Sequence, residues 1–334
     1  MRALDGVEVS AIGIQRVSLE HAFLEGTRAA MYAVWVSGLW TRPHADGGRG
    51  RRIGIRRAPL PNTHNMQVVF TDLDGSMIDR DTYSFEAARP ALDWLTQCGV
   101  PVVFVSSKTR AELTFWRRET GNTHPFVVEN GGAVVIPKGY FERSFPGERP
   151  SRAADTIELG LSYKFLVAEL RRASRAARCP TRGFHDMNAE HIASQFSLTL
   201  EQAQMAKKRE FDEPFVVLEE ARREALIEEL ERAGLSCTSG GRLLHLSGQS
   251  DKGVAVRELI QRYESAWGPV RSFGLGDGMN DIPMLKNVSV PVILRSPSAP
   301  AMAWLLPGAI VTDLVGPLGW NQAVLELVTG EPVA

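Results

Sequence analysis

The sequence predicts an α/β protein built on a doubly wound parallel sheet, with a second α/β domain inserted into the first. From residue 66 onward, short apolar segments typical of strands alternate with amphipathic segments typical of helices. The strand segments are apolar along their whole length, as expected for parallel strands covered by helices on both faces. The alternation gives way to long helical stretches between about residues 145 and 246 and then resumes, which indicates an insertion.

The composition is that of a folded globular protein with room for two domains. The chain has 334 residues, of which 44% are hydrophobic and 23% are charged, and its net charge is -1. These values argue against a disordered, collagen-like or strongly basic nucleic-acid-binding chain. Three scattered cysteines, Cys98, Cys179 and Cys237, support neither a disulfide framework nor a zinc site and fit a reducing cytoplasm. No membrane partner is expected, because the apolar stretch at 29–40 falls short of the roughly 20 residues that span a bilayer.

The first 65 residues differ in composition from the rest. They contain nine arginines, no lysine and five acidic residues, a net charge of +4, which leaves -5 for the remainder. The segment has no sustained helical or strand period beyond a short apolar patch, so we expect residues 1–65 to be a poorly ordered basic extension. A nucleic-acid or membrane-surface arm is the other interpretation. Met66 stands directly before the first convincing strand, and our hypothesis is that Met66 is the natural start of the protein.

The predicted elements follow one another in a Rossmann-like order. Core strands are expected over residues 67–71, 100–105, 126–128, 133–136, 271–275, 290–294 and 309–312. Core helices are expected over residues 84–97, 109–120 and 252–266. Within the insertion, we expect helices over 154–177, 188–209 and 219–233 and strands over 215–218 and 243–246. The core therefore comprises residues 66–145 and 247–334, the inserted domain comprises 146–246, and ligands are expected at the carboxyl ends of the core strands.

Two aspartates come directly after the first predicted strand. Asp72 and Asp74 are separated by one residue, so their side chains point to the same side of an extended chain. Such a pair would repel unless a divalent cation or a shared proton compensates, and carboxylate oxygens suit a hard cation such as Mg²⁺. One aspartate can then attack phosphorus while the other protonates the leaving oxygen. An ordinary turn would explain the aspartates and Gly75 about equally well, so the chemical interpretation needs further residues.

Other predicted strand ends and helix starts supply these residues. Asp277 follows another apolar strand and can complete the oxygen shell of the same cation, while Asn280 or Asp281 can cap the next helix. Ser106 stands between a strand and a helix N-terminus, which suits a phosphate group, although a simple N-cap would also explain it. Lys252 lies in the first turn of a helix, where the helix dipole disfavours a cation. We therefore expect its ammonium group to serve a bound anion.

Taken in chain order, these residues resemble the four motifs of the haloacid dehalogenase superfamily of phosphohydrolases. The resemblance implies that Asp72 is the nucleophile, forming an aspartyl-phosphate, and that Asp74 is the general acid and base. It also implies that Ser106 and Lys252 bind the phosphoryl group during its transfer. Mg²⁺ would then be held by the Asp72 side chain, the Asp74 backbone carbonyl and Asp277.

The insertion is similar to the mixed α/β cap, of C2 type, of the Cof-like sugar phosphatases in this superfamily. Finer matches to the mannosyl-3-phosphoglycerate phosphatase family lie at 83–85, 105–110, 128–132, 183–187 and 208–215. The resemblance begins at Met66. It implies that the chain is a phosphoric monoester hydrolase that converts mannosyl-3-phosphoglycerate into mannosylglycerate, a compatible solute, and phosphate. The implied partner is a small phosphorylated sugar acid. Glucosyl-3-phosphoglycerate stays open as the substrate, because the two sugars differ in the orientation of one hydroxyl.

A phosphorylated sugar acid carries a carboxylate and hydroxyls, which need cations and paired acceptors as partners. The candidate substrate contacts are Lys108, Asn130, His185, Arg209, Glu210 and Asp281. An αL turn would explain Asn130 equally well, an Asx turn would explain the loop at His185, and a solvated helix end would explain Arg209. A non-catalytic phosphate-binding module, with the basic extension as a nucleic-acid arm, is the alternative from another class. The pair Asp72 and Asp74 argues against it, since binding alone needs no nucleophile and acid.

Overall fold

The computed structural model describes residues 66–141, 147–151, 153–240 and 243–329. These residues all belong to one compact unit. The predicted basic extension, residues 1–65, lies outside the described residues. Within the described ranges, every helix is too short or too polar to cross a membrane.

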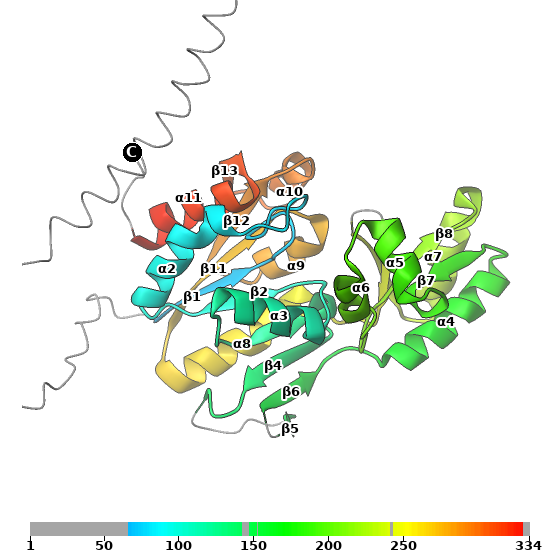
Figure 1. Cartoon of the computed structure of the whole chain (residues 1–334), viewed down its shortest axis with the longest axis horizontal. Coiled ribbons are helices and arrows are strands. Elements are labelled where there is room, and N and C mark those ends of the chain that lie inside the picture. Colours follow the sequence, from blue (N-terminus) through cyan, green and yellow to red (C-terminus); the bar gives the residue numbers. More distant parts are fainter. Residues whose placement is uncertain (1–65, 142–146, 152, 241–242, 330–334) are drawn as a thin grey trace, which may run out of the picture. The chain divides into compact units, whose positions relative to one another are not determined.

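A nine-stranded sheet forms the centre of this unit (Figure 1). Its strands, in spatial order, are β13 (Ile310–Val315), β12 (Val290–Arg295), β11 (Val270–Gly276), β1 (Met66–Thr71), β2 (Val102–Val105), β3 (Phe126–Val128), β4 (Ala133–Pro137), β6 (Ala154–Glu158) and β5 (Arg149–Pro150). Adjacent strands from β13 to β3 are parallel, whereas β4, β6 and β5 pair antiparallel at one edge. The predicted α/β class and its mainly parallel sheet are confirmed.

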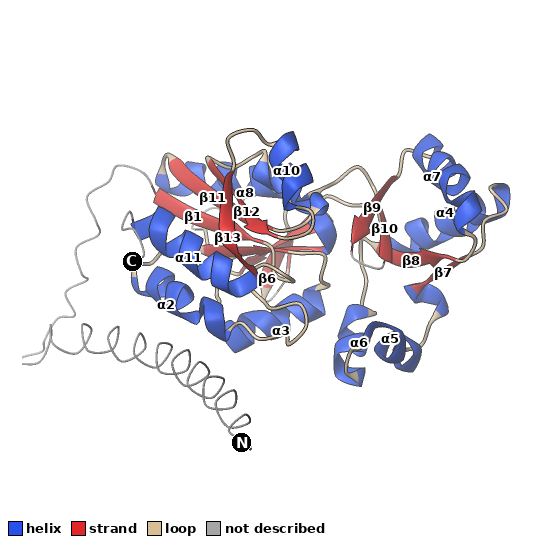
Figure 2. Ribbon diagram, turned by 90° about the horizontal axis from the view of Figure 1, so that it is seen from above, coloured by secondary structure: helices blue, strands red, loops and turns tan. Residues whose placement is uncertain are grey.

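Helices cover both faces of this sheet (Figure 2). Successive side chains of a strand point to opposite faces, so Val69 enters one apolar cluster while Val68 and Phe70 enter the other. The first cluster contains residues of α2 (Arg89–Gln97), α3 (Arg110–Thr120) and α11 (Gly316–Thr329). The second contains residues of α8 (Lys252–Trp267), α9 (Ile282–Leu285) and α10 (Ala299–Leu305). Burial on both faces explains why the central strands are apolar throughout.

Local capping sets where the two helices nearest the predicted site begin. The Thr109 hydroxyl accepts from the N–H of Glu112 at 3.2 Å, and the Glu112 carboxylate accepts from the N–H of Thr109 at 2.8 Å. Asp251 caps α8 by accepting from the N–H of Val254 at 2.8 Å. These caps leave the β2–α3 loop and the start of α8 at the carboxyl ends of the strands.

The insertion contains a four-stranded antiparallel sheet of its own. Its strands, in spatial order, are β7 (Thr181–Gly183), β8 (Glu213–Val217), β10 (Leu243–Ser247) and β9 (Ser236–Gly240). Helices α4 (Tyr163–Ala176) and α7 (Arg223–Arg232) bury Leu166 and Leu226 against Phe215 of this sheet. Helices α5 (Ala189–Phe196) and α6 (Leu200–Ala206) enclose a smaller apolar cluster around Ile192.

Two predicted helices of the insertion are wrong in detail. The predicted helix over 154–177 begins at Tyr163, because residues 154–158 form strand β6 and pair with β4 of the central sheet. The central sheet therefore extends to Glu158, beyond the boundary predicted at residue 145. The predicted helix over 188–209 is two helices, since Ser197 has a left-handed φ of 58° and Thr199 caps the second one. Strands β5, β7 and β9 and helices α10 and α11 were not predicted, whereas α9 begins at Ile282, directly after the residues expected to cap it.

Candidate active site

The loops that carry the predicted chemical residues meet at one edge of the central sheet. Strands β11, β1 and β2 are neighbours and run parallel, so their carboxyl ends lie side by side. Asp72 follows β1, Ser106 follows β2 and Asp277 follows β11. All three residues are buried, and the first turn of α8 adds Lys252 to the same group. The structure thus brings together residues that lie up to 205 positions apart in the sequence.

Lys252 joins two of the acidic residues. Its fully buried Nζ donates to Asp72 Oδ1 and to Asp281 Oδ1, both at 2.6 Å. Burial alone would lower the pKa of Lys252, but the carboxylates of Asp281 and Asp72 outweigh burial and raise the pKa above its ordinary value. Lys252 is therefore a permanent cation, and it touches the residue expected to act as the nucleophile.

Three buried carboxyl groups fit a divalent cation. Asp72, Asp277 and Asp281 each offer an oxygen, and these oxygens lie within 4.8 Å of one another. Burial raises the pKa of Asp72 to about 8 and that of Asp277 to about 6, and neighbouring carboxylates add to both shifts. The three carboxylates repel one another, and the neighbouring cations offset this repulsion only in part. A hard divalent cation prefers such a crowded set of oxygen donors.

The Asp74 side chain points to another partner. Its Oδ2 accepts from Lys108 Nζ at 2.8 Å, and its Oδ1 is buried without a hydrogen-bond partner among the described residues. Lys108 is itself buried and lies 3.9 Å from Glu112 Oε1. The turn at Gly75, which has a φ of 82°, directs the chain away after these aspartates. Asp74 thus has one oxygen held by a cation and one oxygen available for proton exchange.

Ser106 is buried at the start of the loop that follows β2, where it contacts the loop that follows β3. Its hydroxyl oxygen accepts from the N–H of Lys108 at 3.3 Å, and its carbonyl oxygen accepts from the N–H of Asn130 at 2.9 Å. The hydroxyl proton therefore stays available to donate to an anion. The Asn130 side chain also connects two regions, donating to Asp212 Oδ2 at 3.1 Å and accepting from Asn280 at 3.2 Å.

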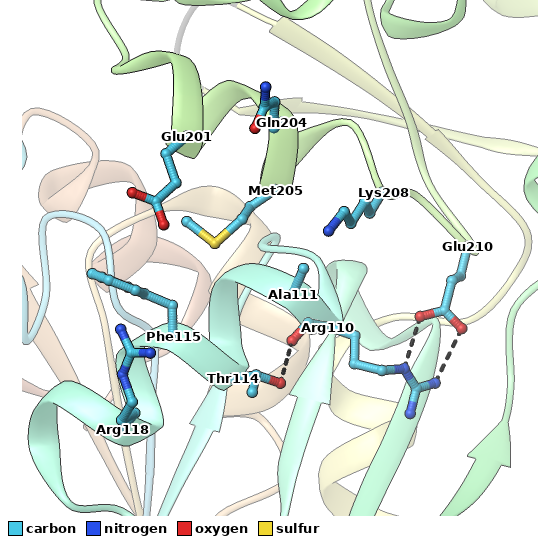
Figure 3. Close-up of a pocket in the computed structure, with 10 residues that line it drawn as sticks. All are labelled: Arg110, Ala111, Thr114, Phe115, Arg118, Glu201, Gln204, Met205, Lys208 and Glu210. Carbon is cyan, nitrogen blue, oxygen red and sulfur yellow. Dashed lines mark hydrogen bonds and ion pairs between the residues drawn. The ribbon is translucent and has the colours of Figure 1, made fainter.

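The cap residues predicted to contact substrate make contacts with protein. Arg209 Nη1 donates to the carbonyl oxygen of Ser107 at 2.8 Å, and Glu210 binds Arg110 through both carboxylate oxygens at 2.8 and 3.1 Å (Figure 3). His185 Nδ1 lies 2.6 Å from the buried Glu213. Arg209 and Glu210 thus connect the segment before β8 to the core. His185 binds Glu213 of β8 within the insertion.

Glu129 was not predicted as a functional residue. Its buried carboxylate accepts from the backbone N–H of Glu210 at 3.0 Å and of Phe211 at 2.8 Å. Burial is the main reason that its pKa rises to about 7. Its backbone φ of 49° is rare for a charged residue, but the only sequence signal is the Gly131-Gly132 pair that follows.

A cavity of about 270 Å³ adjoins Lys252 and also borders Asn130 and Asn280. The insertion and the loop after it contribute mainly hydroxyl groups to its lining, from Ser236, Thr238, Ser239, Ser247 and Ser250. The Ser250 hydroxyl is buried without a hydrogen-bond partner among the described residues. None of these serines and threonines was predicted, because isolated hydroxyl residues carry no sequence signal and strand β9 was not expected.

A larger groove of about 620 Å³ lies between α3 and α6, away from the acidic residues. Phe115 and Met205 face each other across it, and Lys208 and the ion pair of Arg110 with Glu210 line its other side (Figure 3). None of the aspartates of the acidic cluster lines this groove. The smaller cavity is therefore the one that adjoins the predicted chemistry.

Comparison with known proteins places this arrangement in a family. The family model described as haloacid dehalogenase-like hydrolase matches residues 69–302. The glucosyl-3-phosphoglycerate/mannosyl-3-phosphoglycerate phosphatase of Methanococcoides burtonii is 40% identical over 267 residues, which cover 78% of this chain and 97% of that protein. The mannosyl-3-phosphoglycerate phosphatase of Pyrococcus furiosus is 33% identical over 231 residues, which cover 69% of this chain and 91% of that protein.

Solved structures agree on the fold. A haloacid dehalogenase-like hydrolase from B. subtilis matches with a TM-score of 0.58 at 15% identity, covering 78% of this chain and all of that one. A haloacid dehalogenase-like hydrolase from Bacteroides thetaiotaomicron matches with a TM-score of 0.56 at 15% identity, covering 79% of this chain and all of that one. With the family model covering most of the described residues, the chain belongs to the haloacid dehalogenase-like hydrolases.

Proposed function

We propose that this protein is a Mg²⁺-dependent phosphatase that hydrolyses mannosyl-3-phosphoglycerate, with glucosyl-3-phosphoglycerate as the alternative or additional substrate. The observation that carries the proposal is the contact of Lys252 with Asp72 inside a cluster of three buried carboxyl groups at the strand ends. The relatives at 40% and 36% identity are named for both glycosyl phosphoglycerates, which supports a site that accepts either sugar.

The proposed reaction begins at Asp72. One carboxylate oxygen of Asp72 forms a bond to phosphorus while the ester bond from phosphorus to the glycerate oxygen breaks. Asp74 donates a proton to that leaving oxygen through its unpartnered side, and the sugar acid departs. Water then attacks the aspartyl-phosphate and gives its proton to Asp74, which releases phosphate and restores both aspartates.

The remaining residues of the site hold charge in place. Lys252 and the Ser106 hydroxyl are proposed to bind the non-bridging oxygens of the phosphoryl group, since Lys252 contacts Asp72 and Ser106 follows β2, the strand that neighbours β1. The Asp72 side chain, the Asp74 carbonyl and Asp277 would hold the metal, which supplies neutralisation of phosphoryl charge. Asp281 is proposed to position Lys252, because its two oxygens accept from Lys252 and from backbone amides.

The substrate's other groups can be assigned to the walls of the site. Lys108 is proposed to attract the glycerate carboxylate, because its ammonium binds one oxygen of Asp74 while the other oxygen of Asp74 is assigned to the leaving group. Asn130 and the hydroxyl-lined cavity are proposed to receive the sugar. The proposed role of Arg209, Glu210 and His185 is structural: they hold the segment before β8 in place, since their polar atoms are already engaged with protein partners.

The test is phosphate release from mannosyl-3-phosphoglycerate, glucosyl-3-phosphoglycerate, 3-phosphoglycerate and simple hexose phosphates, with Mg²⁺ or with EDTA. We expect Mg²⁺-dependent release that strongly prefers the glycosyl phosphoglycerates. Asp72→Asn should abolish release, whereas the matched control Asp93→Asn, an exposed aspartate on α2, should retain it. Broad activity on hexose phosphates would overturn the substrate, and a full rate in EDTA would overturn the metal.

A further inference from the structure

Arg80 lies over the acidic loops without any role in the proposed reaction. Its Nη2 donates to Asp277 Oδ2 at 2.8 Å and approaches the backbone carbonyl oxygen of Asp74 at 3.5 Å. The guanidinium packs closely on Gly75, where an added Cβ would lie 2.7 Å from the same nitrogen. One nitrogen atom thus lies against two groups that, under the proposed function, hold the metal: the Asp277 carboxylate and the Asp74 carbonyl.

The position of Arg80 differs from that of the other cation in the site. Lys252 is fully buried and contacts Asp72 and Asp281, so its ammonium has no route away from the cluster. The Arg80 side chain is 59% exposed, whereas the Asp277 side chain that it contacts is only 8% exposed. Arg80 can therefore leave the carboxylate by rotating into solvent, without any change in the packed core.

A metal ion and this guanidinium would compete for the same two groups, the Asp277 carboxylate and the Asp74 carbonyl. Mg²⁺ binds its ligand oxygens at about 2.0–2.1 Å in near-octahedral geometry, which leaves no room for a second cation bridging the same pair. The two positive charges would also repel each other at this distance. Among the described residues, the Asp277 carboxylate otherwise accepts only a long hydrogen bond of 3.4 Å from Ser76, so Arg80 is its main cationic partner.

We propose that Arg80 is a built-in competitor of the metal, which neutralises Asp277 in the metal-free protein and swings into solvent when the metal binds. The inference rests on the proposed function for its metal ligands, but it does not depend on which substrate is hydrolysed. It predicts that Arg80 weakens metal binding and stabilises the metal-free protein. If Arg80 only oriented Asp277 toward the metal, it would strengthen metal binding instead of weakening it.

The test is direct binding of Mn²⁺ to the full chain without substrate. Binding is monitored through the electron paramagnetic resonance signal of the free ion. We expect Arg80→Gln to lower the Kd for Mn²⁺ about two- to five-fold, the range that corresponds to loss of one partly exposed ion pair. The matched control is Arg89→Gln, which removes an exposed arginine paired with Glu86 and should leave the Kd unchanged.

Thermal unfolding supplies a second readout that does not require activity. In EDTA, Arg80→Gln should melt at a lower temperature than the wild type, and saturating Mg²⁺ should remove the difference. An unchanged or weaker affinity of Arg80→Gln for Mn²⁺ would overturn the proposal for Arg80. Loss of Mn²⁺ binding in Asp277→Asn would show that the metal site itself is correct, and a wild type that binds no Mn²⁺ would overturn both proposals.

Discussion

The buried carboxyl group of Glu129 should make the stability of this protein fall as pH rises toward neutrality. Its oxygens accept from the backbone N–H groups of Glu210 and Phe211, and Arg209 lies near enough to favour the charged form. Burial opposes ionisation more strongly and raises the pKa from 4.5 to about 7. Glu129→Gln keeps the shape of the side chain and removes its titration.

The sign follows from proton binding in the two states. Between pH 4.5 and about 7, the folded protein keeps the Glu129 proton while the unfolded chain has released it. The folded state therefore binds more protons, and the free energy of unfolding decreases as pH rises through this window. A shift of one pKa unit corresponds to about 1.4 kcal/mol, so the full window is worth up to about 3 kcal/mol.

Urea unfolding followed by tryptophan fluorescence, from pH 4.5 to 8 in saturating Mg²⁺, measures this effect. The acidic cluster is the same in both proteins, so the wild type minus Glu129→Gln difference isolates Glu129. We expect this difference in the free energy of unfolding to decrease by up to about 3 kcal/mol across the range. Glu220→Gln, an exposed glutamate of the insertion, is the control. Parallel pH profiles for wild type and Glu129→Gln would refute the reasoning.

Three further changes test contacts of the described structure. Lys252→Met leaves two buried carboxyl groups without their shared cation, so urea unfolding in EDTA should show a loss of about 3–5 kcal/mol. Gly132→Ala would place a Cβ 2.3 Å from the Cβ of Phe211, and a thermal melt should show a loss of about 1–3 kcal/mol. A double-mutant cycle of Arg110→Gln with Glu210→Gln should give a coupling below about 1 kcal/mol in urea unfolding, because the pair is partly exposed.

The central sheet could be predicted because its signals are local. The stretch Val68–Phe70 is apolar on both faces, and the helices beside it are amphipathic, so the α/β class follows from a few residues at a time. The strands that were missed lack such a signal. Strand β9 is Ser-Cys-Thr-Ser-Gly, and β6 carries Asp155 and Thr156 where a buried strand would be apolar. Their pairing with a neighbour, rather than their own composition, makes them strands.

The placement of Asp72, Ser106 and Asp277 at one edge was also predictable, since parallel neighbours end together. The side-chain partners at that edge were not. Contacts such as Lys108 with Asp74 or Arg80 with Asp277 join residues 34 and 197 positions apart. No periodicity in the sequence records which cation lies against which carboxylate, and only the folded geometry decides it.

The insertion and the chemistry are connected through the same short segment of chain. Arg209 binds the carbonyl oxygen of Ser107, next to Ser106, and Phe211 donates its N–H to Glu129, next to Asn130. The loops after β2 and β3 therefore carry chemical residues and also hold the segment that leads into β8. A displacement of that segment must break these bonds or move the loops. Because the Arg209 and Glu129 side chains each bind a backbone group across this boundary, changes in the segment 209–211 should alter turnover even where no side chain touches the substrate.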